Sequence, residues 1–492
     1  MTPKPDPDIT LDKHSTALLA ERELYKHSEA LPKKLNLKDL VLMQILYLLV
    51  PTVVGTAAKL GSSQFVFWLV GILLFNLPVV IVAIYLNNLM PMEGGLYQWA
   101  KLGFNEFTGF MVAWNLWFYA IIVMPAFGLM LATGLSYAIG PSAAWMNENK
   151  VFLALVNVAL VSFVVVASVR GFGVGKWIHN AGGLVVLLAH VILVGLALWS
   201  LAHGTLRQYR PLTLALPVLS FFSLVVFTKA LFTALAGFEY VAILAGEYRA
   251  PRHTFLHSVA ISAPLLALLY ILGTGAVQAF VPIRDLDLVN PIPQALSIGF
   301  RALGTTAYLA RIVIWAFLFR AVASASLFIT NTARLPLAAG WDGLLPAWFT
   351  KLHPKYKTPV NSILVIGLIA LGMGLVSVIG VGDQEAFQLL DNISLVHYAL
   401  TYLVMFALPV IGLQALGKPS PLWLKIVSTS GFIVSLLFVV LSIFPIIGVQ
   451  SRFAFSFKII VVVGGANIIG ASVFRAGSRK EKRNRRVPST AS

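Results

Sequence analysis

The sequence predicts an all-α polytopic membrane protein, and three observations support this fold class. Of its 492 residues, 58% are hydrophobic and only 11% are charged, with a mean hydropathy of +0.85, so polar side chains are too few to cover a water-soluble fold. Apolar runs of at least about 18 residues recur, each long enough to cross a hydrocarbon layer of roughly 30 Å. The sequence lacks the short alternating strands of a transmembrane barrel.

Twelve membrane-spanning helices are expected from these runs. Residues 1–38 are polar and show no apolar core followed by a small-residue cleavage site, so the first span is expected to serve as the insertion signal. The predicted spans are 39–60, 64–90, 105–138, 150–169, 177–201, 218–246, 254–281, 305–335, 359–380, 385–413, 421–447 and 455–475.

The positive charges indicate the orientation of the chain. Twelve spans place both termini on one side, and most of the 36 Lys and Arg residues fall in the segments on that side. This is the positive-inside pattern, so we expect both termini to be cytoplasmic in a bacterial inner membrane. Anchoring beside anionic lipid explains the net charge of +17 and the basic tail 476–492, and no nucleic-acid partner is expected.

The first span carries a helix-breaking sequence at its middle. Pro51 removes a backbone donor and clashes with the preceding turn, and Gly55 follows one turn later. Such an interruption is tolerated at membrane depth where it is buried in protein or lines a cavity. Taken alone, Pro51 is also consistent with a simple proline kink.

The sixth span contains a second interruption, a cluster of small residues at 234–237 that precedes the carboxylate of Glu239. A carboxylate at this depth marks a pathway or a site by default. The sixth span also begins a second set of five helices, so its position corresponds to that of the first span. Two interrupted helices in corresponding positions indicate a transporter whose site lies at the midplane.

The helix ends at these breaks suit a zwitterionic substrate. The second half of the first span exposes backbone amides at its positive end, which favour a carboxylate. The first half of the sixth span ends in unpaired carbonyls, which favour an ammonium group. We therefore expect an amino acid to bind between Pro51, Thr52, Val54 and Gly55 on one side and Phe232, Ala236 and Gly237 on the other.

Three stretches resemble a known family. P-M-E-G-G-L-Y-Q-W-A-K-L-G-F at 91–104 resembles the loop after the second span of amino acid/polyamine/organocation (APC) transporters. The sixth-span A-G-F-E-Y and the segment 331–359, with its D-G-L-L-P and final T-P, are similar to the same family. The resemblance implies a LeuT-like transport core with two inverted five-helix repeats, near 39–201 and 218–413, followed by two C-terminal helices within 421–475.

Two further stretches resemble the glutamate/γ-aminobutyrate antiporter branch of this superfamily. L-Y-L-L-V-P-T stands at the first break, and H-Y-A-L-T-Y at 397–402 is similar to a pair of substrate-facing tyrosines. The resemblance implies that Tyr398 and Tyr402 face the substrate. It also places Ser324 where that branch carries a glutamate, and the long C-terminal plug of the branch is missing. A general amino acid transporter is therefore expected.

Arg320 lies midway along the eighth span, one turn before Ser324. Because arginine keeps its proton, it must face water, a carboxylate or helix-end carbonyls. It is expected to contact the substrate carboxylate, to pair with Glu239, or to act as a fixed cation in place of a coupling sodium; a structural ion pair is the alternative. Glu239 is expected to serve in gating or proton coupling, or else to pin the broken helix.

Other polar residues of the spans have less specific surroundings. His190 titrates near neutral pH when exposed and is a candidate for proton coupling, although a lone buried histidine is usually just hydrogen-bonded. Lys229 is expected in the outer vestibule or snorkelling to the interface. Asp391 is an outer-gate residue or a loop contact, and the aromatic residues of the third span are expected mainly in packing.

Other functional classes have little support in the sequence. The chain has no cysteine, and it lacks H-E-x-x-H, G-x-S-x-G and P-loop motifs, so an enzyme, a metal site and a cofactor are not expected. Two alternatives to amino acid transport remain, a polyamine or organocation transporter and a transport-deficient amino acid sensor. Proton-coupled symport and amino acid exchange both remain open, as do a monomer and a homodimer.

Overall fold

The computed structural model describes residues 36–90, 95–170, 172–206, 208–238, 251–303, 307–338, 347–356, 358–416 and 419–486. Throughout these ranges the regular elements are helices. Glu239 and the sixth-span residues that follow it up to 250 lie outside the described residues.

The helices from α2 to α9 precede the sixth span. Their bounds are α2 Leu37–Leu48, α3 Pro51–Ala58, η1 Gly61–Ser63, α4 Gln64–Gly71, η2 Ile72–Asn76, α5 Leu77–Leu89, α6 Leu96–Gly103, α7 Glu106–Ile139, η3 Pro141–Asn147, α8 Lys150–Arg170 and α9 Phe172–Ala202. The second span is one continuous helical stretch in which η2 is a π-helical turn between α4 and α5.

The remaining helices run from α10 to α18. Their bounds are α10 Phe221–Leu235, α11 Pro251–Phe280, η5 Ile283–Asp285, α12 Pro291–Ala302, α13 Ala307–Ala338, α14 Ala347–Thr350, α15 Val360–Ser377, α16 Asp383–Ala407, η6 Leu408–Gly412, η7 Leu413–Leu416, α17 Leu422–Leu441 and α18 Arg452–Arg486.

The described helices account for the predicted spans. Ten of them are long and apolar enough to cross a membrane, and the bent pair α2 and α3 brings the number to 11. The sixth span is present as the shorter apolar helix α10, whose continuation lies outside the described residues. Most predicted boundaries agree with the helices to within about five residues. The exceptions are at the C-terminal end, where α17 ends at Leu441 instead of 447 and α18 continues to Arg486, beyond the predicted end of the twelfth span at 475.

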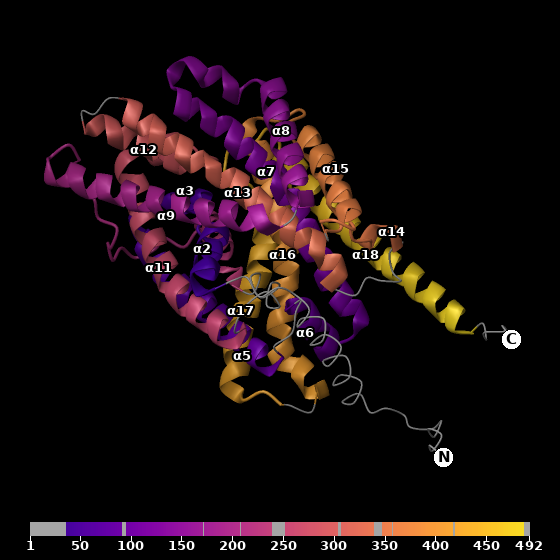
Figure 1. Ribbon diagram of the computed structural model, residues 1–492. Coiled ribbons are helices and arrows are strands. Elements are labelled where there is room, and N and C mark those ends of the chain that lie inside the picture. Colours follow the sequence, from indigo (N-terminus) through magenta and orange to yellow (C-terminus); the bar gives the residue numbers. More distant parts are fainter. Residues whose placement is uncertain are drawn as a thin grey trace.

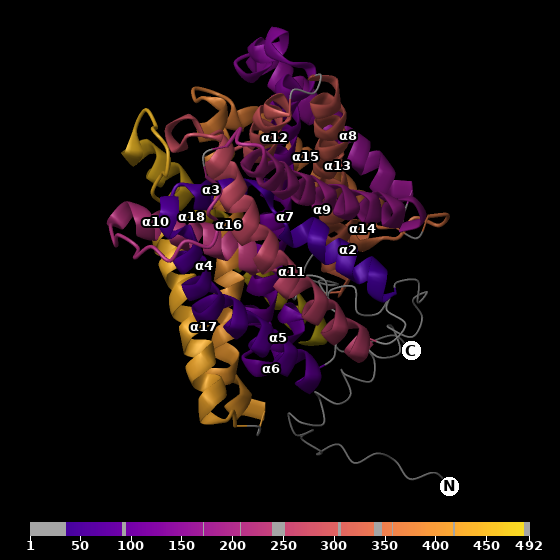
Figure 2. The ribbon, with the colours of Figure 1, turned by 90° about the vertical axis from the view of Figure 1, so that its left-hand side faces the viewer.

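Three helices form the middle of the bundle. Figures 1 and 2 show α7, α13 and α16 running through the molecule, and α7 packs against both of the others. α17 and α18 lie at the periphery, where large apolar side chains such as Ile433 and Phe453 are exposed. An apolar outer surface of this kind is compatible with lipid, because the interior backbone groups of each helix are paired within the helix.

The first span breaks as its proline predicts. α2 ends at Leu48, α3 begins at Pro51, and the two helices meet at an angle of 43°. Pro51 occupies the first position of α3, where its missing N–H costs nothing and its fixed φ favours a helix start. Val50 is extended, so the helix is interrupted rather than kinked.

The second break is set by a glycine. α10 ends at Leu235, Ala236 is extended, and Gly237 has φ +127°, a conformation that residues with a Cβ rarely adopt. A Cβ at Gly237 would lie 2.4 Å from Cε1 of Tyr47 and 2.8 Å from Cδ2 of Leu48. The second break therefore lies directly against the last turn of α2, and the two interruptions meet in the middle of the protein.

Candidate functional site

A buried cavity lies where the two broken helices meet. Its volume is about 40 Å³, measured as the space open to the centre of a water molecule, which is room for a few waters. The walls come from α2, α3, α7, α10, α13 and α16. Its polar lining residues are Thr52, Thr233, Arg320, Ser324 and Asp391, and its aromatic ones are Tyr47, Tyr119, Phe127, Phe232, Phe328, Phe387 and Tyr398.

A tyrosine from the seventh span holds the first break open. The Val50 amide donates to the hydroxyl of Tyr270 over 2.9 Å, and this hydroxyl in turn donates to the carbonyl of Leu48. The Val53 amide bonds to the Val50 carbonyl over 3.1 Å. Pro51 has no amide hydrogen, and Thr52, the second residue of α3, lies at the cavity wall with no partner for its amide among the described residues.

Tyr402 terminates α10. The Gly237 amide, which would bond to the Thr233 carbonyl if the helix continued, donates instead to the Tyr402 hydroxyl over 2.6 Å. Tyr402 is fully buried and packs on Phe232, with ring centroids 5.3 Å apart, but it does not line the cavity. Tyr402 therefore stabilises the end of α10 from the side away from the cavity.

Tyr402→Phe is expected to lower the stability of the protein while leaving the shape of the cavity unchanged. The substitution removes the acceptor of a buried amide, which costs about 1 to 3 kcal/mol. The measurement is the melting midpoint of the purified protein. Tyr308→Phe, at a tyrosine 70% exposed on α13, is the matched control and should leave the midpoint unchanged. An unchanged midpoint in Tyr402→Phe would contradict the supporting role.

Stacked aromatic rings form the wall between α7 and α16. Tyr119 lies parallel to Tyr398 with ring centroids 4.5 Å apart, and the Tyr47 hydroxyl donates to that of Tyr119 over 3.1 Å. Phe328 stacks on Tyr47 at 5.2 Å. These rings give the cavity flat apolar sides with hydroxyl groups between them, as in sites that fit a small organic molecule.

Arg320 places a buried positive charge on the cavity. Its side chain is 2% exposed, and within the described ranges its Nε and Nη1 atoms have no hydrogen-bond partner and no carboxylate lies within ion-pair distance. The guanidinium lies 5.9 Å from the ring centre of Phe127. Ser324, one turn along α13, also has no described partner for its hydroxyl. Two buried donors therefore face the cavity without a described acceptor.

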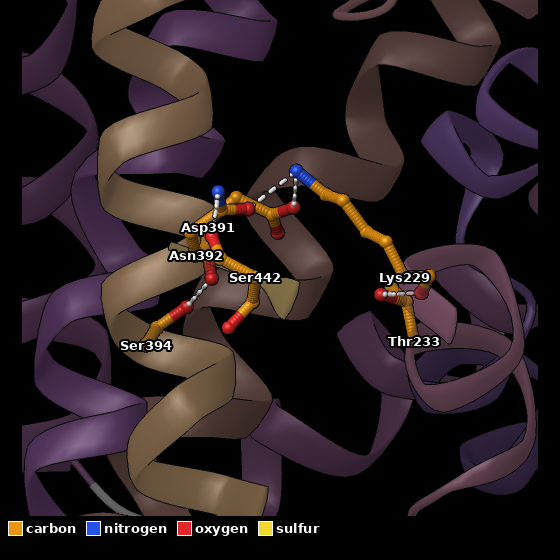
Figure 3. A network of polar contacts seen from close by, with 6 residues as sticks. All are labelled: Lys229, Thr233, Asp391, Asn392, Ser394 and Ser442. Atoms are coloured by element: carbon orange, nitrogen blue, oxygen red, sulfur yellow. Dashed lines mark hydrogen bonds and ion pairs between the residues drawn. The ribbon is translucent and has the colours of Figure 1, made fainter. Parts of the chain in front are cut away.

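Lys229 reaches across one rim of the cavity from α10 to α16. Its Nζ lies 3.3 Å from Asp391 Oδ2 and donates to Asn392 Oδ1 over 2.5 Å. Asn392 Nδ2 donates to the carbonyl of Ser442 at the end of α17 over 2.7 Å. Figure 3 shows the lysine side chain extended toward the two α16 residues, with Thr233 one turn further along α10. The network ties three spans together.

A polar vestibule lies beyond this rim. It has a volume of about 700 Å³, and its walls carry both signs of charge. The first turn of α16 contributes to the vestibule, and the following turns of the same helix line the cavity, so the two spaces follow one another along α16. The ionisable residues around the vestibule are Lys59, Tyr137, Arg284, Asp285, Asp287, Asp383 and Glu385.

The structure brings six of the predicted site residues to the cavity wall and leaves the others elsewhere. Those at the wall are Thr52, Phe232, Ala236, Arg320, Ser324 and Tyr398. Pro51, Gly237 and Tyr402 form the breaks themselves. Glu239 lies outside the described residues.

Val54, Gly55 and His190 lie away from the cavity lining. A Cβ at Gly55 would lie 2.8 Å from Pro291, so this glycine permits close packing of α3 on α12. Val54 is fully buried and lies near Gly273 of α11. His190 is buried on the same side, with Nδ1 bonded over 2.8 Å to the Val186 carbonyl of its own helix. None of the three contributes to the cavity lining in this conformation.

Two residues that shape the candidate site were missed by sequence reasoning. Tyr47 lines the cavity beside Gly237, and Tyr270 fixes the first break. Tyr47 lies one turn before Pro51, and this spacing could have indicated it. Tyr270 lies in an apolar run more than 200 residues from the break, and nothing in its neighbourhood distinguishes it. Of the third-span aromatic residues, Tyr119 and Phe127 reach the cavity, while Trp114 packs against α18.

The comparisons with known proteins agree with this geometry. The chain matches the amino acid permease family over residues 40–465, which is most of its length. It belongs to that family. This permease is therefore a member of the APC superfamily, as the motifs at 91–104 and in the sixth span predicted.

Two relatives are transporters by name. The permease is 27% identical over 380 residues to an uncharacterised transporter of Legionella pneumophila, covering 76% of this chain and 80% of the relative. It is 23% identical to the probable agmatine/putrescine antiporter of Lactococcus lactis, covering 76% and 78% of the two chains.

A solved structure identifies the fold of the permease. The crystal structure of MhsT in complex with L-phenylalanine has a TM-score of 0.58 and 15% identity, and the match covers 82% of this chain and 97% of that one. The permease accordingly has the LeuT-like fold, with two inverted five-helix repeats and two further helices. The predicted fold class is confirmed.

Proposed function

We propose that this permease moves α-amino acids across the cytoplasmic membrane by alternating access. The observation that carries the proposal is the cavity between the two broken helices, in which the Arg320 guanidinium and the Ser324 hydroxyl have no described partner. A buried unpaired charge is unfavourable unless a ligand of opposite charge joins it, and a substrate carboxylate supplies that charge.

The remaining polar groups fit the rest of an amino acid. The Thr52 amide adds a donor for the carboxylate at the first break. The end of α10, with Thr233 and Ala236 at the wall, presents carbonyls to the ammonium group. Tyr398 and Phe232 shape the pocket for the side chain. Pro51 and Gly237 keep the two helix ends apart, and Glu239 remains the predicted group for gating or proton coupling.

A second candidate is a polyamine transporter, which the relationship to an agmatine/putrescine antiporter favours. Arg320 argues against it, because a substrate with two positive charges would meet a third one in a buried cavity. Amino acid transport is therefore the better-supported function. Proton-coupled symport and amino acid exchange are both compatible with this proposal.

The proposed arrangement in the membrane follows the distribution of charge. Both termini lie in the cytoplasm of a bacterial cell, with 1–38 and 476–492 as tails around a transport core at 39–413 and two further spans within 421–475. The polar vestibule then opens to the outside, because it lies one membrane crossing away from the start of α2.

Thermal stabilisation against a ligand panel tests the function. The panel contains neutral and acidic α-amino acids, γ-aminobutyrate, agmatine and putrescine. An α-amino acid at about 100 times its Kd is expected to stabilise the native state by about 2.7 kcal/mol and so raise the melting midpoint by several degrees. Stabilisation by the polyamines alone would overturn the proposal.

Tyr398→Ala is expected to weaken amino acid binding by at least about tenfold, because it removes a wall of the cavity and its stacking on Tyr119. The readout is the ligand concentration that gives half of the maximal shift in the melting midpoint. The control is Tyr308→Ala, which removes an exposed ring of the same type. Equal affinities in the two variants would place the substrate elsewhere.

A further inference from the structure

Two ion pairs join corresponding helices of the two repeats. Of the ion pairs within the described ranges, Lys101 with Glu106 and Arg284 with Asp285 lie close in sequence and near the surface. The other two join separate spans. Lys229 with Asp391 connects α10 to α16, and Lys176 with Asp39 connects α9 to α2.

The second of these pairs is built like the first. Lys176 Nζ lies 2.7 Å from Asp39 Oδ2, and Asn180 Nδ2 donates to Asp39 Oδ1 over 2.8 Å. The Asp39 side chain is 5% exposed and also accepts from the Asn36 amide at the start of α2. Each pair is thus a lysine and an aspartate on different helices, with an asparagine of the fifth span of its repeat as third member.

The positions of the pairs follow the inverted symmetry of the fold. α2 begins the first span of the first repeat and α9 is its fifth span, while α10 and α16 hold the same places in the second repeat. The charges are exchanged between the repeats, since the aspartate is on the first span in one and on the fifth span in the other. Both pairs are formed by the half of a broken helix that precedes its break.

The two pairs lie on opposite sides of the cavity. Asp39 precedes Tyr47 at the cavity wall by two turns, and the same span continues through Thr52 to Lys59 at the vestibule, so Asp39 is on the side away from the vestibule. Asp391 follows the vestibule residue Asp383 by two turns of α16 and itself lines the cavity. The pair with Lys229 is therefore on the vestibule side.

We propose that these pairs are two latches, one for each side of the membrane, that close the cavity by holding a half-helix against the fifth span of its repeat. The inference rests on the proposed alternating-access function. Both latches are formed in this structure, and the cavity between them has room for only a few waters. Opening one side requires one latch to break while the other holds.

Cysteine accessibility from each face of the membrane tests the latches. The chain has no cysteine, so Ala126→Cys supplies one reporter thiol inside the cavity. A charged, membrane-impermeant methanethiosulfonate reagent is added to intact cells and, separately, to inverted membrane vesicles. With both latches formed, the reporter is expected to react slowly in both preparations.

Removing one latch should open one face only. In the reporter protein, Lys229→Met is expected to speed the reaction by about tenfold or more from the vestibule face, and Lys176→Met from the opposite face, because each shifts the population toward one open state. Lys101→Met removes an exposed pair and should change neither rate. If Lys229→Met does not fold, the neutral combination Lys229→Met with Asp391→Asn carries the same expectation.

Two outcomes would overturn the proposal. One is that both lysine variants raise the rate from the same face, and the other is that a folded variant leaves both rates unchanged. The assay uses no substrate, so a negative ligand panel would remove the proposed amino acid function without affecting this result. Conversely, unchanged accessibility together with a positive panel would reject the latches alone.

Discussion

Gly237→Ala is expected to destabilise the permease by about 2 to 6 kcal/mol and to abolish transport. A side chain at φ +127° costs about 1 to 3 kcal/mol, and overlap in a packed interior costs about as much again. The overlap falls on Tyr47 and Leu48, 2.4 and 2.8 Å from the new Cβ, so relief of the clash must push α2 away from the end of α10. The displacement of α2 therefore changes the structure at the cavity.

Gly195→Ala is the matched control for this substitution. Gly195 lies in the interior of α9, and nothing within 4 Å would meet its Cβ. Alanine there should be neutral or stabilising by up to about 1 kcal/mol, as for a glycine in a helix. The measurements are the melting midpoint and amino acid uptake into proteoliposomes. Similar midpoints for the two variants would show that the conformation at Gly237 is not required.

Arg320→Met is expected to weaken amino acid binding by about 10- to 150-fold, because hydrogen bonds to a charged group are worth about 1.5 to 3 kcal/mol. The unliganded protein should be as stable as the parent or more so. A methionine of similar length removes a buried charge that has no described carboxylate partner. The affinity for the amino acid is therefore expected to fall, while the stability of the unliganded protein stays the same or rises.

Binding and melting measurements on the same preparations check this prediction, with Arg311→Met on the exposed face of α13 as control. An unchanged Kd in Arg320→Met would contradict the contact with the substrate carboxylate. A large loss of stability without ligand would instead mean that Arg320 pairs with a carboxylate of the protein. Pairing with Glu239 is one of the roles that the sequence suggests for Arg320.

The fold was predictable because its signals are local. Span length follows from apolar runs, and Pro51 and the small residues at 234–237 interrupt helices wherever they stand. The places of both breaks were therefore correct to within a few residues. The family motifs then identified the order of the repeats, which composition alone does not reveal.

The site was predictable only in part, because packing decides which face of a helix meets the cavity. Tyr398 and Tyr402 are one turn apart, yet one lines the cavity and the other lies behind the end of α10. Gly55 looks like part of a helix break in the sequence, but Pro291 of α12 explains its lack of a side chain. Tyr270 binds the first break from another span, a relation that no local pattern contains.

The tyrosines at the breaks also connect the chemistry of the site to its motion. The Val50 amide donates both to Tyr270 on α11 and to the Leu48 carbonyl, whereas the Gly237 amide donates to Tyr402 on α16. If α16 shifts relative to the end of α10, the Gly237 amide is released as an additional backbone donor beside the cavity. The number of hydrogen bonds that the protein can offer a substrate then differs between conformations. Such a difference gives the substrate unequal affinity for these conformations, which is the thermodynamic condition for a ligand to shift their populations.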